Sequence, residues 1–245
     1  MKFLLCCLLI SANLSFAAEP DELIKTAKLL LSDNFNRVEK DDSKEELGKA
    51  WITNSERRAK GIKQADLTGE ALLITMAKEA DHAVSVKHDA PFDDGIVRIR
   101  FKMHDKKGIK FNFNDPAARK VTWAGHISKV QVKPNTVIIG DDKTGVFDLK
   151  IRAQRQYKNL EKNKKAELNK FLKTKQASYK VDLKTGEWYV ITIVNIGPKV
   201  TVWIDEKKIG SFESVGLDHK VKQNLAFGVP GSVSIDDIKI WSLDK

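Results

Sequence analysis

Residues 186–212 read GEWYVITIVNIGPKVTVWIDEKKIGSF, with two β-branched runs on either side of an Ile-Gly-Pro turn. In the second run, residues 200–204, three aliphatic side chains alternate with Thr201 and Trp203. A third short run, 209–212, follows an Asp-Glu-Lys-Lys turn. This period of two is typical of half-buried antiparallel strands. Because such a meander cannot bury its apolar face alone, the stretch predicts a second sheet packed against it.

The clearest strand in the first half of the chain is predicted over residues 96–103. Its apolar residues alternate with cationic ones, which puts the two sets on opposite faces. A turn at 104–108 is expected to lead into a second alternating strand, 109–114, as a hairpin. We predict that one side of this hairpin forms a ligand-binding face of six polar side chains: Arg98, Arg100, Lys102, Lys110, Asn112 and Asn114.

The remaining patterns indicate a single β domain. Further strands are predicted near 28–35, 71–76, 82–88, 121–132, 135–140, 146–152, 225–229 and 232–241. Residues 155–176 differ, because an apolar stripe on a Lys-rich segment without Gly or Pro is typical of a helix. The sequence therefore predicts an all-β fold: a two-sheet antiparallel jelly-roll sandwich over residues 28–245, with one helical insertion near 155–176. Residues 18–27 are expected to form a loose or helical lead-in.

The N-terminal residues 1–17 have the pattern of a signal peptide, with one basic residue, an apolar core, and the small residues Ser15 and Ala17 before the cleavage position. Cleavage near Ala17 predicts an exported protein, periplasmic or secreted. The apolar run is too short to span a membrane, and no other segment is expected to cross one. A lipid anchor is the alternative, but both cysteines lie early in the apolar core, where a lipidated cysteine is not expected.

The chain of 245 residues carries a formal net charge of +10. Excess positive charge favours anionic partners, such as oligosaccharides or polysaccharides with acidic or sulfated groups, cell-wall polymers or nucleic acid. A well-solvated surface is the alternative interpretation of the same charge. Nucleic acid is less favoured, because the sequence has no helix-turn-helix, zinc or RNA-binding motif. Nothing in the pattern specifies an oligomeric state.

Four short motifs, in their order along the chain, resemble the concanavalin A-like lectin and glucanase jelly rolls. They are Ser-Asp-Asn-Phe at 32–35, Gly-Glu-Trp at 186–188, Val-Trp-Ile-Asp at 202–205 and Ser-Ile-Asp-Asp-Ile at 234–238. Ala-Gly-His at 124–126, Asp-Asp-Lys-Thr-Gly at 141–145 and the stretch around His219 are similar to a group of exported proteins of planctomycete-type bacteria. That group belongs with the glycoside hydrolase family 16-like and 3-keto-disaccharide hydrolase domains. The resemblance implies a jelly roll over residues 28–243 and a carbohydrate ligand.

The sequence departs from the catalytic motif of the family 16 glucanases, Glu-x-Asp-x-x-Glu on one strand. That spacing puts the nucleophile and the acid on one strand face, within reach of a single glycosidic bond. The 3-keto-disaccharide domain often shows Asn-Ser-Gly-Ile followed by Arg, where this chain has Lys-Gly-Ile-Lys at 107–110. A carbohydrate-cleaving activity would therefore need a different set of residues.

The candidates for such a catalytic set are His126, Asp142, Lys143 and His219. His126 opens one predicted strand and the Asp-Asp-Lys turn at 141–143 closes the next, so a hairpin would bring them to one rim of the sandwich. A histidine beside an aspartate is an oriented base, and a nearby lysine can stabilise a developing oxyanion. Ordinary turn chemistry with a solvated histidine is the alternative.

Asp33, Asp236 and Asp237 are candidate ligands of a structural calcium ion. In jelly rolls of this kind the first and last strands pair, so their carboxylates and nearby backbone carbonyls can surround a cation. Turn and bulge chemistry explains the same residues without a metal.

Three classes of function stay open. An exported, non-catalytic glycan-binding module is favoured, because the carboxylate pair of the glucanases is missing. A hydrolase acting on glycosides or 3-keto-glycosides is the second class, and it depends on the cluster around His126. A structural envelope protein, with neither ligand nor turnover, is the third.

Overall fold

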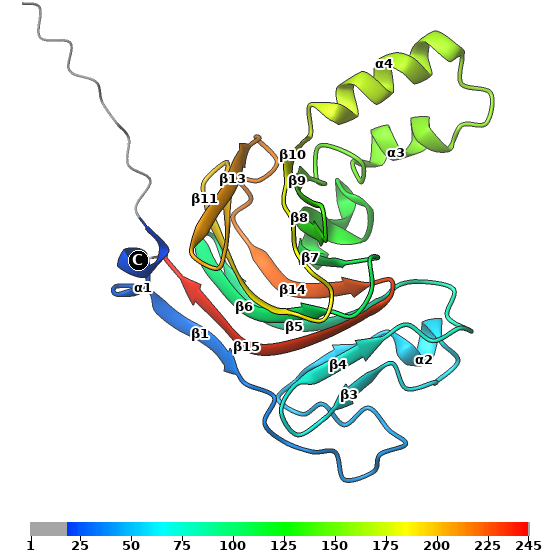
Figure 1. Ribbon diagram of the computed structural model, residues 1–245. Helices are drawn as coiled ribbons and strands as arrows, with labels where there is room; N and C mark the ends of the chain where they lie inside the picture. Colours follow the sequence, from blue (N-terminus) through cyan, green and yellow to red (C-terminus); the bar gives the residue numbers. More distant parts are fainter. Residues whose placement is uncertain (1–18, 245) are drawn as a thin grey trace, which may run out of the picture.

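Two antiparallel sheets packed face to face form the body of the protein (Figure 1), and the computed structural model describes residues 19–244. The predicted signal peptide, residues 1–17, lies outside the described residues. One sheet has eight strands and the other has seven. This arrangement confirms the predicted all-β, two-sheet jelly-roll sandwich. Within residues 19–244, no helix has the length and apolar character needed to cross a membrane.

The 8-stranded sheet contains the meander of residues 188–213 and the first and last strands. Its members are β1 (Lys28–Asp33), β3 (Ala65–Leu67), β4 (Leu72–Thr75), β6 (Gly95–Met103), β11 (Trp188–Ile196), β12 (Lys199–Ile204), β13 (Lys207–Glu213) and β15 (Ser232–Ser242). They are ordered β13-β12-β11-β6-β15-β4-β3, and β1 also pairs with β15.

The 7-stranded sheet is built mainly from the middle of the chain. Its members are β2 (Ile52–Thr53), β5 (Val84–Phe92), β7 (Ile109–Asn114), β8 (His126–Lys133), β9 (Thr136–Asp141), β10 (Gln176–Lys180) and β14 (Lys222–Val229). They are ordered β10-β9-β8-β7-β14-β5-β2.

Short helices surround the sandwich and one pair projects from it. They are α1 (Pro20–Ile24), α2 (Ser55–Arg58), the 3-10 turns η1 (Pro116–Lys120) and η2 (Trp123–Gly125), α3 (Leu149–Gln156) and α4 (Lys162–Lys173). Figure 1 shows α3 and α4 extending away from both sheets, beyond β8, β9 and β10.

Tight turns hold the meander β11–β12–β13 together. Gly197 has a φ of +51° between β11 and β12, and Asp205 and Glu206 have φ values of +47° and +65° between β12 and β13. Two consecutive residues with positive φ match the type I′ turn, whose twist suits a two-residue hairpin. Val202 is buried between the sheets, as the alternation predicts. Trp203 faces the other way and is buried as well, because side chains from α1 and the residues after it pack there.

Aromatic side chains connect the two sheets across the core. The ring of Phe101 on β6 meets the ring of Phe111 on β7 edge-on, with centroids 6.1 Å apart. Phe111 contacts Phe227 on β14 at 6.0 Å, and Trp51 stacks on Phe227 at 5.6 Å. Burial of each such side chain stabilises the fold by about 1.5–3 kcal/mol. The core therefore fixes which faces of the two sheets remain available to solvent.

The predicted hairpin of residues 96–114 is wrong. β6 pairs with β11 and β15, whereas β7 pairs with β8 and β14, so the turn between them crosses from one sheet to the other. Gly108 makes this crossing possible: its φ is +77°, and a Cβ there would lie 2.1 Å from the carbonyl oxygen of Val132. Alternation predicts both strands correctly, but it cannot distinguish a hairpin within one sheet from a connection between two sheets.

The helical insertion also differs from the prediction, because it contains two helices. The Asp148 carboxylate accepts hydrogen bonds from the backbone N–H groups of Lys150 and Ile151, at 2.9 and 3.0 Å, and so caps the N-terminus of α3. The predicted strand at 146–152 is therefore wrong. The chain becomes extended at Tyr157, and α4 ends before β10 begins at Gln176.

Candidate functional site

A groove of about 460 Å³ lies on the outer face of the 7-stranded sheet. Side chains of β5, β7 and β14 form its floor, and α2, η1 and η2 contribute to its walls. This volume is within the range of ordinary small-ligand sites.

Amide side chains and small residues make up the floor. Asn114 Nδ2 donates to Asn224 Oδ1 at 3.0 Å, and Asn112 Nδ2 donates to the Ala226 carbonyl at 3.3 Å. A Cβ at Gly228 would come within 3.1 Å of Asn112 Nδ2, so the glycine leaves this part of the floor open. Asn114 Oδ1 is buried and has no hydrogen-bond partner within residues 19–244. The floor thus presents partly exposed amide side chains to the groove.

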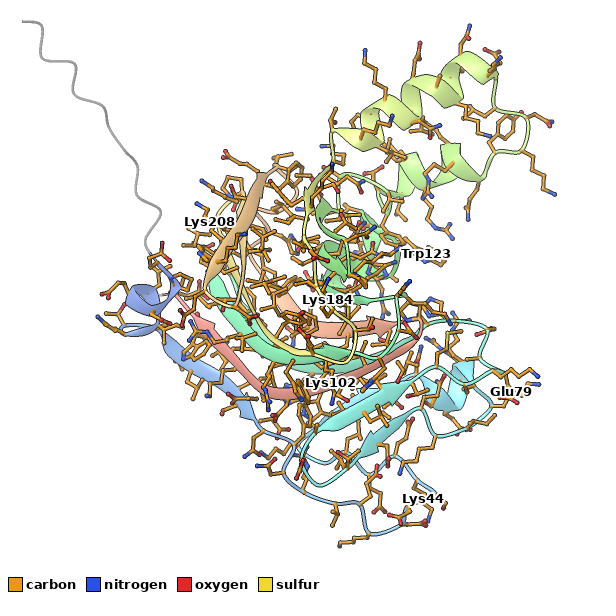
Figure 2. The ribbon with its side chains drawn as sticks, in the orientation of Figure 1. Lys44, Glu79, Lys102, Trp123, Lys184 and Lys208 are labelled. Carbon is orange, nitrogen blue, oxygen red and sulfur yellow. The ribbon has the colours of Figure 1, made fainter. Side chains whose placement is uncertain are left out.

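The wall next to β8 presents an exposed tryptophan (Figure 2). Trp123 is 48% exposed, and its backbone N–H donates to the Phe147 carbonyl at 2.8 Å. The turn behind it needs Gly125, whose φ is +79° and whose Cβ would lie 2.2 Å from the Asp115 carbonyl oxygen. The Arg152 guanidinium lies 3.8 Å from the centre of the Trp123 ring. This turn therefore holds a large aromatic surface beside the groove.

His126 lies on the same wall, as the first residue of β8. Its ring stacks on Phe147 with centroids 4.2 Å apart. Burial, together with the nearby Lys129, His82 and Lys110, lowers the pKa of His126 to about 4. His126 is consequently a neutral imidazole at neutral pH. Its Nδ1 is buried and has no partner among the described residues.

Asp142 forms a buried pair with Lys129 behind this wall. Lys129 Nζ donates to Asp142 Oδ1 at 2.5 Å, while Oδ2 has no partner in the described part of the chain. Burial raises the pKa of the Asp142 carboxyl, and the lysine offsets only part of this. Asp142 does not line the groove, so its predicted catalytic role is not supported by its position.

The other two predicted catalytic residues contact each other at a different place. Lys143 Nζ donates to His219 Nδ1 at 3.2 Å, and His219 Nε2 donates to Asp115 Oδ2 at 2.9 Å. Because Lys143 can only donate, these two hydrogen bonds fix the tautomer of His219 that carries its hydrogen on Nε2. Neither residue lines the groove. Of the predicted set of four, only Lys143 and His219 contact each other, whereas His126 stacks on Phe147 and Asp142 pairs with Lys129.

The predicted ligand-binding face is divided between the two sheets. Lys110, Asn112 and Asn114 belong to β7, but Arg98, Arg100 and Lys102 lie on the outer face of the 8-stranded sheet. The three cations there are already engaged: Arg98 pairs with Asp21 of α1, and Arg100 donates to Asp236 at 2.9 Å. Arg100 and Lys102 also lie 4.3 and 4.7 Å from the ring centre of Trp188.

The three candidate calcium ligands are each paired with a cation of the chain. Asp33 accepts from Arg37 at 2.7 Å, from Lys49 at 3.1 Å and from the Trp51 indole N–H at 2.8 Å. Burial alone raises the pKa of Asp33, but these donors and the Phe35 N–H outweigh it and lower the value to about 2. The other two pair as follows: Asp236 with Arg100, and Asp237 with Lys239. Within residues 19–244, no group of three or more His, Cys, Asp or Glu side chains is placed to hold a metal ion.

The charge of the groove lining is strongly positive. Among the described lining residues, Glu56 carries the only carboxylate, whereas Arg57, Arg58, Lys87 and Arg119 are cationic. A retaining or inverting glycosidase needs two carboxyl groups on either side of the scissile bond. The lining does not supply that pair.

Two features of this site are missing from the sequence prediction. Trp123 lies in the segment 121–132, which the sequence predicts as a strand, and the Ala-Gly pair at 124–125 is the one local indication of a turn there. Asn224 lies on β14, a strand that the alternation identified only from residue 225.

Comparisons with known proteins support the fold. No protein-family model matches the chain, and no curated protein matches it. Among solved structures, the laminarinase from Rhodothermus marinus is similar with a TM-score of 0.56 at 10% identity, over 88% of this chain and 97% of that one. SCLam, a non-specific endo-β-1,3(4)-glucanase from family GH16, has a TM-score of 0.54 at 11% identity, over 89% and 92%. The carbohydrate-binding module CBM66 from Bacillus subtilis has a TM-score of 0.50 at 11% identity, over 78% and 95%. The chain thus shares the concanavalin A-like jelly-roll fold of these proteins.

Proposed function

We propose that this protein is a glycan-binding module that holds an oligosaccharide in the groove without cleaving it. One observation carries the proposal: an exposed tryptophan stands beside a groove whose lining includes the partly exposed amide and imidazole side chains of Asn112, Asn114 and His126. A sugar ring has an apolar face of C–H groups and an edge of hydroxyl groups. Trp123 offers a surface for the first, and the exposed polar atoms of Asn112, Asn114 and His126 offer hydrogen bonds to the second.

The names of the structural neighbours agree with a carbohydrate ligand. One of them is a carbohydrate-binding module, one is a laminarinase and one is an endo-β-1,3(4)-glucanase. Cationic residues around the groove favour oligosaccharides with acidic or sulfated groups. Export, which residues 1–17 predict, would bring the module to glycans outside the cell.

Cleavage of a 3-keto-glycoside, the activity that the motif resemblance implies, is the second candidate. The contact of Lys143 with His219, and of His219 with Asp115, is the observation in its favour. Both ring nitrogens of His219 are occupied, so proton transfer there needs one of these contacts to break. Binding without turnover is therefore the better-supported function.

Paired tryptophan variants test the proposal. Trp123→Ala removes the aromatic surface of the groove, and Trp188→Ala removes an aromatic ring from the outer face of the other sheet. We expect Trp123→Ala to weaken binding of a β-1,3-gluco-oligosaccharide or an acidic oligosaccharide by about tenfold or more, and Trp188→Ala to leave it nearly unchanged. Calorimetric titration measures both.

Other results would contradict the proposed site or the proposed absence of cleavage. Equal losses in both variants, or a loss with Trp188→Ala alone, would move the ligand away from the groove. Release of new reducing ends, or turnover of a 3-keto sugar that stops with His219→Ala, would favour the enzyme. If no sugar binds and none is cleaved, a structural role remains.

A further inference from the structure

The two projecting helices hold most of the net charge of the protein. We call residues 149–175, which include α3 and α4, the helical arm. The helical arm contains ten of the 43 Lys and Arg residues and two of the 33 Asp and Glu residues. Its net charge of +8 leaves only +2 for the rest of the chain, whose formal total is +10. The sandwich is almost neutral, and the positive charge is concentrated on one element.

The cations of the helical arm are exposed and mostly unpaired. Lys164 forms an ion pair with Glu161 at 3.5 Å, and Lys175 at the base approaches Asp141 at 3.9 Å. Six exposed lysines have no carboxylate within ion-pair distance in residues 19–244: Lys150, Lys158, Lys162, Lys165, Lys170 and Lys173. Like charges three or four positions apart on a helix destabilise it. A bound polyanion would relieve this repulsion.

The base of the helical arm is firmly attached to the sandwich. Leu149 N–H donates to the Val121 carbonyl at 3.2 Å, and Arg155 Nη1 donates to the Val146 carbonyl at 3.0 Å. At the other end, Lys175 Nζ donates to Thr144 Oγ1 at 2.8 Å, just before β10. These hydrogen bonds hold the base of the helical arm against the sandwich, so the lysines of the two helices lie on one projecting surface.

This surface fits a polymer better than a membrane. Leu168 is buried, and no continuous apolar stripe of α4 is left exposed. A helix that lies in a membrane surface needs a free apolar face to insert. Phe171 is partly exposed, but Lys175 Nζ lies 5.2 Å from its ring centre. Charge, and not apolar area, is what the helical arm presents.

We propose that the helical arm is a second binding surface for an anionic polysaccharide whose repeating carboxylate or sulfate groups meet its lysines. Arg152 of α3 lies against the Trp123 ring, which stands beside the groove, so the two surfaces adjoin. A chain that occupies the groove would continue along Arg152 onto the helices. The choice of a polysaccharide as the ligand rests on the proposed function. The experiment below tests binding to the helical arm separately from binding in the groove.

A charge-matched pair of variants tests the inference. The arm variant carries Lys158→Gln, Lys162→Gln, Lys165→Gln, Lys170→Gln and Lys173→Gln. The control variant loses the same charge at exposed, unpaired positions on the sandwich: Lys106→Gln, Lys107→Gln, Lys199→Gln, Lys207→Gln and Lys208→Gln. Glutamine supports helices nearly as well as lysine, and a circular dichroism melt checks that both variants fold.

Binding of heparin and of polygalacturonate is measured against NaCl concentration. We expect the arm variant to bind at least one of them about tenfold or more weakly at ~0.05 M NaCl, with a shallower salt dependence. The control variant should change by less than about threefold. A neutral β-1,3-gluco-oligosaccharide should bind both variants like the unaltered protein.

Several results would overturn the inference. Equal losses in the two variants would show that only net charge matters, and absence of binding to either polysaccharide would remove the ligand. A loss confined to phosphatidylglycerol vesicles or to duplex DNA would assign the arm to a membrane or a nucleic acid. If the arm variant behaves as expected while Trp123→Ala still binds the neutral sugar normally, the groove proposal fails and the arm stands.

Discussion

The outer faces of the two sheets both carry polar residues, but these residues differ in whether their polar groups have partners in the protein. On the 8-stranded sheet, Arg98 contacts Asp21, and Arg100 contacts both Asp236 and Trp188. On the 7-stranded sheet, Asn114 Oδ1 and His126 Nδ1 are buried without a partner among the described residues. The number of polar residues is therefore a poor guide to a binding face. Whether those residues are already paired with other side chains must be considered as well.

The largest expected effect distinguishes a buried ion pair from an ion pair on the outer face of the 8-stranded sheet. Asp33→Ala removes the acceptor of Arg37 and of the Trp51 indole N–H, and leaves a largely buried cation unpaired. We expect the free energy of unfolding to fall by about 3–5 kcal/mol. Asp236→Ala breaks the more exposed pair with Arg100 and should cost about 0–1 kcal/mol. Urea denaturation of the two variants measures the difference, and similar losses would contradict the ranking.

We expect His126, on the 7-stranded sheet, to make the stability of the protein depend on pH in the acid range. The folded-state pKa of His126 is lowered from 6.5 to about 4, so the unfolded chain binds this proton first as the pH falls. Stability is therefore lost between pH 6.5 and 4, by up to about 3 kcal/mol, and is fully present above that window. His126→Gln should flatten the stability curve in this range. A curve with the same slope in both proteins would place the titration on another group.

The alternation in the sequence predicts the strands well, because burial of one face leaves a direct trace in residue order. β6, β7 and the meander β11–β13 lie close to where it puts them. The crossing from β6 to β7 has no such trace, since Phe101 and Phe111 alternate in the same way whether they share one sheet or face each other across two.

The candidate site was harder to predict, because it depends on partners far away in the sequence. Asp33 accepts hydrogen bonds from Lys49 and from the Trp51 indole N–H, which lie 16 and 18 positions further along the chain. The His219 contact with Asp115 joins residues 104 positions apart. Trp123 is presented by a turn only three residues long, η2, inside a segment that looks like a strand. Long-range pairing and local turns determine the site. Neither produces a periodic pattern in the sequence from which it could be predicted.

The smallest expected effect concerns calcium. Because Arg37, Lys49 and Trp51 already occupy the oxygens of Asp33, we expect a chelator to leave the melting temperature unchanged. Added calcium should have no effect for the same reason. A melting temperature that rises with calcium concentration would restore the predicted metal site, since a ligand that binds only the folded state stabilises it.

An NMR titration with a β-1,3-gluco-oligosaccharide or an acidic oligosaccharide shows directly which outer face binds the sugar. The side-chain resonances of Trp123, Asn112, Asn114 and Asn224 report on the groove, and those of Arg98, Arg100 and Trp188 report on the other outer face. We expect the sugar to shift the first set of resonances and to leave the second set unchanged. Shifts confined to the second set, or no shift in either, would contradict the proposed site.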